Sequence, residues 1–396
     1  MLHPARPRLL SGVALALLIA ACSSPVSPSP SPSIAASATA SPARTTTAST
    51  EPTTAPSSAG PASPSAAGRW QLVTLPDQAG IANVADLAAA PGRIVAVGGA
   101  APVGAPRALS SSDGGRTWTI EDIPADSRTP SRIVAWGDRF LAAGAGEFDC
   151  SHPFALETWV RSADGTWSAA PADPKLCVGG MGELAVHDGT AVLAGIGAGD
   201  VPFVWSSADG LQWTDRAGAV QADTAPRAVI ADASGFTVFG SSPSGPWDAR
   251  SADGSVWQSE RIPGNAGVVI VAAFHRGAEP AVIAESGSAV GVISQESNGT
   301  WQAEPAAGLA ASILIRVVAV EGGLVALGGG ESGPRLLASA DGTSWRDLEP
   351  PAGSDATTTL TGALVTDGRA FLTGQTTING RSVGVIWTGP ATLLAP

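Results

Sequence analysis

The chain has no tyrosine, a single lysine (Lys175) and only four histidines in 396 residues. Charged residues make up 14% of the sequence, and acidic residues outnumber basic ones by 34 to 22, for a formal net charge of -12. This acidity argues against nucleic acid or an anionic lipid surface as partner, because both are bound by basic patches. No Ser-His-Asp pattern, phosphate-binding loop or cofactor fingerprint is visible. The sequence therefore predicts no cofactor and offers no recognisable catalytic motif.

Long apolar runs are also scarce, and the clearest one lies near the start. Arg6 and Arg8 precede the small and apolar run Leu9–Ala21, and Cys22 follows it directly. The run is shorter than the ~20 residues that a membrane-spanning helix needs. This arrangement resembles a bacterial lipoprotein signal, which implies that residues 1–21 are removed and that Cys22 is lipidated. Removal of the two arginines changes the formal net charge from -12 to -14.

The resemblance to a lipoprotein signal also implies an address. Acyl chains on Cys22 would anchor the protein to the outer face of the bacterial cell membrane, outside the cytoplasm. Residues 22–67 are almost wholly Ser, Pro, Ala and Thr and cannot close a hydrophobic core, so we expect a disordered linker. At ~3.1 Å per residue, this linker could extend roughly 140 Å from the lipid. Residues 68–396 are expected to form one folded domain.

A short turn motif recurs through that domain, and its best form is Ser207-Ala-Asp-Gly-Leu-Gln-Trp213. Its aspartates are Asp113, Asp164, Asp209, Asp253 and Asp341, and its tryptophans are Trp118, Trp167, Trp213, Trp257, Trp301 and Trp345. Successive tryptophans lie 49, 46, 44, 44 and 44 residues apart, and a fixed period of this length is typical of solenoids and propellers. The Asp is expected to accept backbone hydrogen bonds, the Gly to adopt positive φ, and the Trp to pack between sheets.

The motif resembles the Asp-box, or BNR repeat, of the sialidase-like propeller superfamily, where it joins the third and fourth strands of a blade. The full form Ser111-Ser-Asp-Gly-Gly-Arg-Thr-Trp118 is specific for the repeat but not for a function. A sialidase proper is excluded, because the nucleophile of that family is a tyrosine and this chain has none. Non-enzymatic propellers similar to photosystem assembly factors carry the same repeat.

The strand pattern predicts how the propeller closes. The sixth module shows four strands at 316–320, 324–328, 335–339 and 344–348, whereas the last module supplies only three, the final one at 382–388. Residues 69–75 resemble a missing fourth strand, since Trp70 lies 48 residues before Trp118. We therefore expect an all-β, seven-bladed propeller of four-stranded antiparallel blades, with the last blade closed by the N-terminal strand. A six-bladed ring, as in true sialidases, is the alternative.

Cys150 and Cys177 are the only cysteines of the folded region, and the signal directs them out of the reducing cytosol. They are predicted to form a disulfide, since the loops that carry them belong to one face of the second module. A metal site is not predicted, because His152 alone is a poor set of ligands.

Charged residues near the start of the innermost strands form the candidate ligand site. Counting back five residues from each first hairpin turn gives Asp86, Arg132, Glu183, Arg227 and Arg316, with an apolar residue near Val269 and Gly362 in the other two modules. Three arginines that converge on a central funnel would suit a carboxylate or another oxyanion. The alternative is that they face solvent or neutralise the two acids.

Two functions remain open on the sequence alone. The first is a binding or scaffold module, expected to be a monomer, for a protein or glycan partner in the cell envelope. The second is a carboxylate-dependent glycoside hydrolase, for which Asp86 with Glu183, or Glu147 with Asp149, would be the acid pair. His187 and His275 lie next to hairpin turns, and Asn298 belongs to a degenerate copy of the turn motif, so no catalytic role is expected of them.

Overall fold

The computed structural model describes part of the chain. The described residues are 69–77, 80–100, 105–124, 129–145, 156–170, 178–197, 201–216, 218, 220, 223–264, 266–310, 314–330 and 333–396. Every described residue belongs to one of the chain's two units, residues 63–396, which is compact. The expected signal peptide, Cys22 and the linker lie outside the described residues, as do Cys150, Cys177, Glu147 and Asp149.

The second unit is a seven-bladed β-propeller whose blades are four-stranded antiparallel sheets. Blade one consists of β2 (Ile81–Ala90), β3 (Arg93–Ala100), β4 (Pro106–Ser111) and β5 (Thr119–Glu121). Blade two consists of β6 (Arg132–Trp136), β7 (Arg139–Ala145), β8 (Leu156–Arg161) and β9 (Trp167–Ala169). Blade three consists of β10 (Val178–His187), β11 (Thr190–Gly197), β12 (Pro202–Ser207) and β13 (Thr214–Asp215). Blade four consists of β14 (Ala225–Asp232), β15 (Gly235–Ser242), β16 (Gly245–Ser251) and β17 (Gln258–Arg261).

The remaining blades continue the pattern. Blade five consists of β18 (Val268–Arg276), β19 (Glu279–Ser286), β20 (Ala289–Gln295) and β21 (Trp301–Pro305). Blade six consists of β22 (Leu314–Val320), β23 (Gly323–Gly330), β24 (Gly333–Ser339) and β25 (Arg346–Leu348). Blade seven consists of β26 (Thr359–Thr366), β27 (Arg369–Ile378), β28 (Arg381–Pro390) and, from the other end of the chain, β1 (Gln71–Leu72). A 3₁₀ turn, η5 (Ala391–Leu393), follows β28. No helix among these residues is long and apolar enough to span a membrane.

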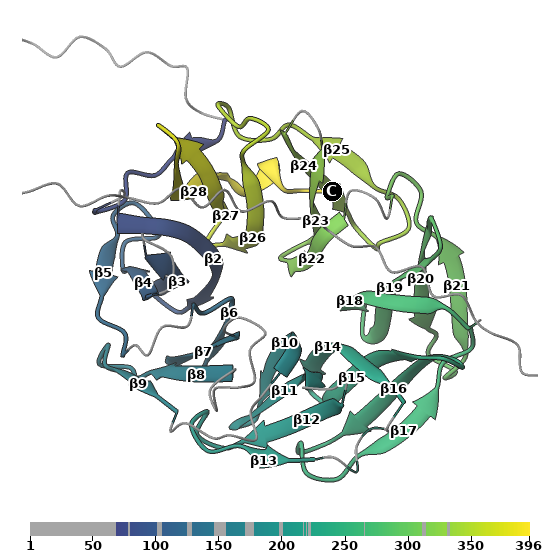
Figure 1. Ribbon diagram of the computed structural model, residues 1–396. Helices are drawn as coiled ribbons and strands as arrows, with labels where there is room; N and C mark the ends of the chain where they lie inside the picture. The colour runs from purple at the N-terminus through teal and green to yellow at the C-terminus, as the bar shows by residue number, and fades with distance from the viewer. Residues whose placement is uncertain are drawn as a thin grey trace, which may run out of the picture. The chain divides into compact units, whose positions relative to one another are not determined.

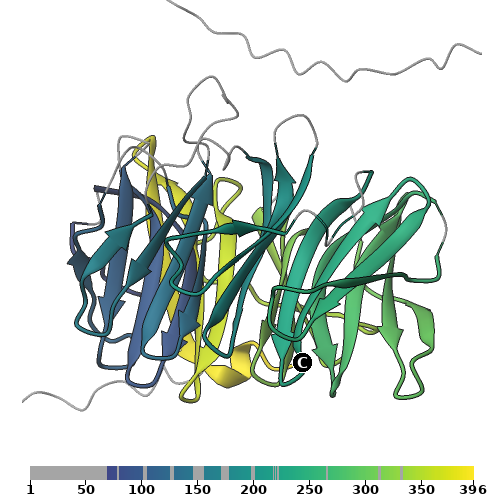
Figure 2. The same cartoon turned by 90° about the horizontal axis from the view of Figure 1, so that it is seen from below.

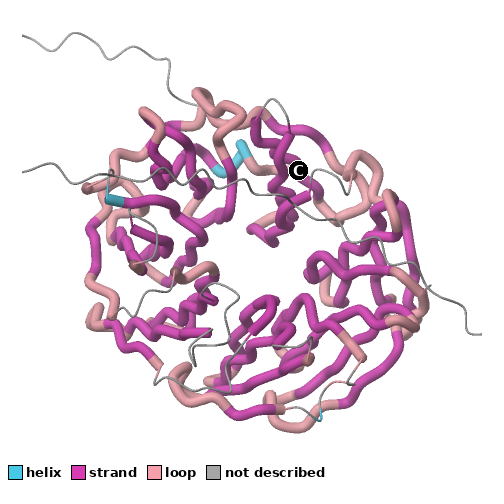
Figure 3. Tube along the Cα trace, in the orientation of Figure 1, coloured by secondary structure: helices cyan, strands magenta, loops and turns pink. Residues whose placement is uncertain are grey.

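The innermost strands form a closed ring (Figure 1), and we call the space that they enclose, where a cavity lies, the channel. Neighbouring blades touch through the successive pairs β2–β6, β6–β10, β10–β14, β14–β18, β18–β22, β22–β26 and β26–β2. Figure 2 shows the blades side by side as upright sheets, and Figure 3 shows that strands and loops account for nearly the whole ring. The seven-bladed prediction is therefore confirmed, and the six-bladed alternative is wrong.

The N-terminal strand closes the ring, as the sequence predicted. Gln71 pairs with Thr388 and Leu72 with Trp387, and the Val73 backbone N–H donates to the Ile386 carbonyl at 2.8 Å. Trp70 lies one residue before the strand and donates from its indole to the Glu349 carbonyl at 3.3 Å. The two ends of the propeller are thus paired in one sheet. This pairing closes the ring and covers the edge of β28.

Seven apolar cores lie between the blades, one for each pair of neighbours. Each core takes one tryptophan that precedes or begins an outermost strand, and these are Trp70, Trp118, Trp167, Trp213, Trp257, Trp301 and Trp345. Each indole packs toward the preceding blade. The repeat period of the sequence is therefore the spacing of the residues that fasten one blade to the next.

The recurring turn is built from local hydrogen bonds, as blade three illustrates. Asp209 Oδ1 accepts from the backbone N–H groups of Leu211 and Gln212 at 2.8 and 2.7 Å, and Ser207 Oγ accepts from the Gly210 N–H at 2.8 Å. Comparable side-chain and backbone hydrogen bonds around Asp253 lower the pKa of that carboxyl to about 2. The glycine is required twice over, because φ at Gly210 is +76° and a Cβ there would lie 2.7 Å from Val160 of blade two.

Candidate functional site

The channel holds a cavity of about 680 Å³, lined by residues of all seven innermost strands. These strands carry a shared irregularity. In β14, β18, β22 and β26 the ladder to the next strand skips one residue, and in β2 it skips two. The skipped residues of β14, β18 and β22 are Arg227, Val271 and Ile315, and all three line the cavity. Bulges redirect side chains. The strand register then aligns one position in every blade, four residues before the last pair of the inner hairpin, and we call this set the ring position.

The ring position is occupied by charged residues in blades one, two, three and six and by small residues in blades four, five and seven. In blade order its members are Asp86, Arg132, Glu183, Ala228, Ala272, Arg316 and Gly362. Four of the five sequence-predicted residues belong to this set. Arg227 is the exception, because it is the bulged residue between the paired residues Pro226 and Ala228. All five nevertheless line the cavity.

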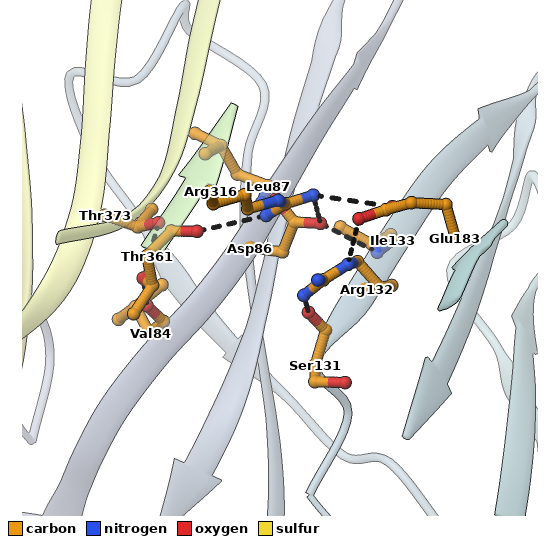
Figure 4. A network of polar contacts seen from close by, with 10 residues as sticks. All are labelled: Val84, Asp86, Leu87, Ser131, Arg132, Ile133, Glu183, Arg316, Thr361 and Thr373. Atoms are coloured by element: carbon orange, nitrogen blue, oxygen red, sulfur yellow. Dashed lines mark hydrogen bonds and ion pairs between the residues drawn. The ribbon is translucent and has the colours of Figure 1, made fainter. Parts of the chain in front are cut away.

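Asp86 is the centre of the charged cluster (Figure 4). Its carboxylate accepts hydrogen bonds from its neighbour Leu87 N–H at 3.0 Å and, across the blade interface, from Ile133 N–H at 3.3 Å. Arg316 Nη1 lies 3.0 Å from Asp86 Oδ1, and Arg316 Nη2 lies 3.2 Å from Asp86 Oδ2. Asp86 is 4% exposed. A buried carboxylate is therefore satisfied by one guanidinium and two backbone donors from three different strands.

Arg316 reaches across the channel to make these contacts (Figure 4). It projects from blade six, donates to the Thr361 carbonyl of blade seven at 3.0 Å, and ends between Asp86 of blade one and Glu183 of blade three, 3.8 Å from the Glu183 carboxylate. Burial by itself would lower the pKa of Arg316, but the charges of Asp86 and Glu183 outweigh burial and raise it. Arg316 thus stays charged and fixed in place.

A glycine lies against the Asp86 carboxylate. Gly362 holds the ring position of blade seven, which lies between blades six and one. A Cβ at Gly362 would lie 3.0 Å from Asp86 Oδ1 and 2.7 Å from Thr373 Oγ1. The absence of a side chain at Gly362 therefore leaves room for the Asp86 side chain beside blade seven. Counting back five residues from the first hairpin turn of the last module gave Gly362, but the sequence alone offers no physical reason for a glycine there.

Arg132 and Glu183 form the second pair of the cluster, with Arg132 Nε 2.9 Å from Glu183 Oε1. Arg132 also donates to the Ser131 carbonyl at 2.8 Å. The side chains are 25% and 32% exposed, so water still reaches this pair. Two arginines and two acids therefore neutralise one another. For Arg132 and Arg316, this is the alternative to ligand binding that the sequence left open.

Arg227 is different from the other two arginines. It is exposed, it lines the cavity, and no ion pair or side-chain hydrogen bond holds it within the described part of the chain. The cavity lining carries three arginines and two acids, and the acids are already engaged by Arg132 and Arg316. One positive charge is left over at Arg227, in a protein whose net charge is strongly negative.

The two acids of the cluster are engaged by arginines. Asp86 and Glu183 both accept hydrogen bonds from arginine side chains, and Arg316 Nη2 lies between them, 3.2 Å from Asp86 Oδ2 and 3.8 Å from Glu183 Oε2. His187 stacks edge-on against Phe236 with ring centroids 5.9 Å apart, and His275 Nδ1 lies 3.8 Å from Asp232. Within the described ranges, no cluster of three or more His, Cys, Asp or Glu residues is placed to hold a metal ion.

No protein-family model matches the chain, and no curated protein sequence matches it. Solved structures do. A structure of YCF48 bound to D1 peptide is 17% identical with a TM-score of 0.53, and the match covers 83% of this chain and 97% of that one. A streptogramin B lyase is 9% identical with a TM-score of 0.54, covering 81% and 97%. A Trypanosoma rangeli sialidase is 13% identical with a TM-score of 0.43, covering 79% and 55%. At these identities the likeness shows a propeller fold and nothing about ligands.

Proposed function

We propose that this protein is a lipid-anchored, extracytoplasmic propeller that binds a protein or glycan partner in the cell envelope, and that an anionic group of the partner enters the central cavity. The unpaired cation at Arg227 carries the proposal, because it faces a cavity whose two acids are already neutralised. A carboxylate that binds there replaces no existing ion pair. The structure of YCF48 with a peptide supports the idea that a ring of this kind can serve as a binding module.

The binding proposal is tested with a chain of residues 22–396 that carries Cys22→Ser and so stays unlipidated. It is titrated calorimetrically with carboxylated ligands of both partner classes, glucuronate and the free-acid peptide Ac-Ala-Val-Leu, and with their uncharged amides. We expect at least one acid to bind, its amide to bind about tenfold more weakly, and Arg227→Gln to cause the same loss. Arg261→Gln is the matched control, because Arg261 is exposed on the outermost strand of the same blade.

The glycoside hydrolase alternative makes a contrasting prediction. If acidic polysaccharides release reducing ends in the presence of the chain, and Glu183→Gln abolishes that release, the protein is an enzyme and the binding proposal is wrong. Membrane anchoring is tested separately in the producing cell, where the native chain is expected in the membrane fraction and the Cys22→Ser chain in the soluble extracytoplasmic fraction. Equal distribution of the two chains would contradict the lipid anchor.

A further inference from the structure

The cavity wall has an unusual composition outside its charged cluster. Every uncharged residue that lines the cavity is Ala, Val, Leu, Ile or Pro. No hydroxyl, amide or aromatic side chain faces it from the described residues. A bound sugar would bring several hydroxyl groups against this wall, and each buried hydroxyl without a partner costs about 1–3 kcal/mol. The wall instead suits the aliphatic part of a ligand.

Part of this aliphatic wall is exposed near the start of the innermost strands. Val269 of β18 is 40% exposed and Ile315 of β22 is 54% exposed, and both line the cavity on neighbouring blades. Pro226 of β14 also lines the cavity, directly before Arg227, but is itself buried. Large apolar side chains that remain open to water at a cavity gain free energy when a ligand covers them.

The apolar surface and the free cation lie on the same side of the channel. Blades four and five contribute Ala228 and Ala272 to the ring position, so no charged side chain fills the channel there. The charged cluster occupies the ring position of blades one, two, three and six. The side chains that line the cavity from blades four and five are therefore aliphatic, apart from the positively charged Arg227.

We propose that the ligand group taken by this cavity is an aliphatic chain that carries one carboxylate, with the carboxylate on Arg227 and the chain against Val269 and Ile315. The inference rests on the proposed binding function and narrows it, because it selects an aliphatic acid over a sugar acid. Such a group occurs in a free carboxylic acid and at the carboxyl terminus of a protein that ends in aliphatic residues. A cavity of about 680 Å³ is in the usual range for small ligands.

Three acids separate these possibilities when they are titrated into the unlipidated chain of residues 22–396 by calorimetry. Octanoate represents a free aliphatic acid, Ac-Ala-Val-Leu with a free carboxylate represents a protein terminus, and glucuronate represents a sugar acid. Octanamide and the peptide amide are the uncharged counterparts. We expect octanoate or the peptide acid to bind, their amides to bind about tenfold more weakly, and glucuronate to show no saturable binding.

Matched variants tie the binding to the cavity. Arg227→Gln is expected to weaken binding of the aliphatic acid about tenfold and Ile315→Ser about threefold. Arg261→Gln and Val256→Ser are their controls, since Arg261 is exposed on the outer strand of blade four and Val256 is 73% exposed in the turn between β16 and β17, and neither lines the cavity. All four positions are exposed, so we expect the variants to fold, which thermal unfolding checks.

The titration results distinguish the ligand classes. Binding of octanoate with these dependences supports a free acid, and binding of the peptide acid alone supports a protein terminus. Arg227-dependent binding of glucuronate without binding of either aliphatic acid overturns the inference but leaves the proposed binding function standing. Binding that ignores both the carboxylate and Arg227, or no binding by any of the three acids, overturns the inference and the anion site together.

Discussion

The most consequential single residue in the ring is Asp86, because one buried carboxylate joins three blades. It receives Arg316 from blade six and the Ile133 N–H from blade two, while its own strand belongs to blade one. Ion pairs at protein surfaces contribute little, but removal of one member of a buried pair leaves an uncompensated charge. The exposed fractions here, 6% for the Asp86 side chain and 15% for Arg316, place this pair among the buried ones.

Asp86→Leu is therefore expected to lower the free energy of unfolding by about 3 kcal/mol, since Arg316 is left charged inside the ring. The double variant Asp86→Leu with Arg316→Met is expected to be more stable than Asp86→Leu alone, because the stranded charge is removed with its partner. Urea unfolding of the two single variants and the double variant measures both effects. Additive losses in the double variant would show that the two side chains act independently.

Asp248 is a second buried acid. Asp86 connects three blades, whereas we expect Asp248 to lower the stability of the fold. It lies at 1% exposure in β16, Arg250 Nε is 2.8 Å from its Oδ2, and its Oδ1 has no hydrogen-bond partner in the described part of the chain. By strand register, the other blades place Ala108, Thr158, Val204, Val292, Leu336 and Ile386 at this position. Burial raises the pKa of Asp248, and Arg250 only partly offsets that effect.

Replacement of Asp248 by valine is expected to stabilise the protein by about 1 kcal/mol at pH 7. The sign with pH follows from the raised pKa. The pKa of Asp248 is higher in the folded state than in the unfolded state. Protonated Asp248 is therefore tolerated at low pH, and the protein loses stability as the pH rises through the folded-state pKa. The advantage of Asp248→Val should thus be larger at pH 7 than at pH 4 in thermal unfolding. An advantage independent of pH would rule out ionisation as its cause.

Among the structural elements, the recurring turn needs a glycine for two reasons: a positive φ and close packing against the neighbouring blade. At Gly342, φ is +83°, and a Cβ would meet Phe274 at 3.0 Å and Val292 at 3.1 Å, both in blade five. Gly322, in the inner hairpin of blade six, has φ of +89° but no atom within 4 Å of its Cβ position. Both glycines adopt a positive φ, but only Gly342 packs against the neighbouring blade.

This difference gives a matched pair of variants. Gly322→Ala is expected to cost about 1 kcal/mol, which is the left-handed backbone penalty alone. Gly342→Ala is expected to cost about 3 kcal/mol, because the added methyl group also overpacks the interface with blade five. Denaturant unfolding of the two variants measures the difference. Equal losses would mean that the turn does not press on the neighbouring blade.

The fold of the whole molecule was predictable from the sequence because its information is local and repeated. The turn motif fixes each third and fourth strand, and the position of Trp70 revealed the closing strand. Strand ends were less certain, and β22 begins at Leu314 rather than at residue 316. The site was predictable only as a set of lining residues. The bulge that displaces Arg227 and the close approach of Asp86 to Gly362 depend on three-dimensional register, which a count along the chain does not contain.

Ring closure is the property of the whole molecule that every other feature depends on. Residues 70–75 contribute Trp70 to the core between blades six and seven, and Val73 and Leu75 to the core between blades seven and one. Val73 and Leu75 are 7% and 4% exposed. A chain that starts at Pro76 loses these contacts and exposes the edge of β28, whereas a chain that starts at Ser63 keeps the entire compact unit.

We expect the chain from Pro76 to lose about 5 kcal/mol of unfolding free energy, the value of burying two aliphatic side chains and most of an indole, and to associate through the unpaired edge of β28. The chain from Ser63 should match the chain of residues 22–396 in thermal unfolding and stay monomeric in size-exclusion chromatography. If the chain from Pro76 were as stable as the chain from Ser63, the seventh blade would not need its fourth strand.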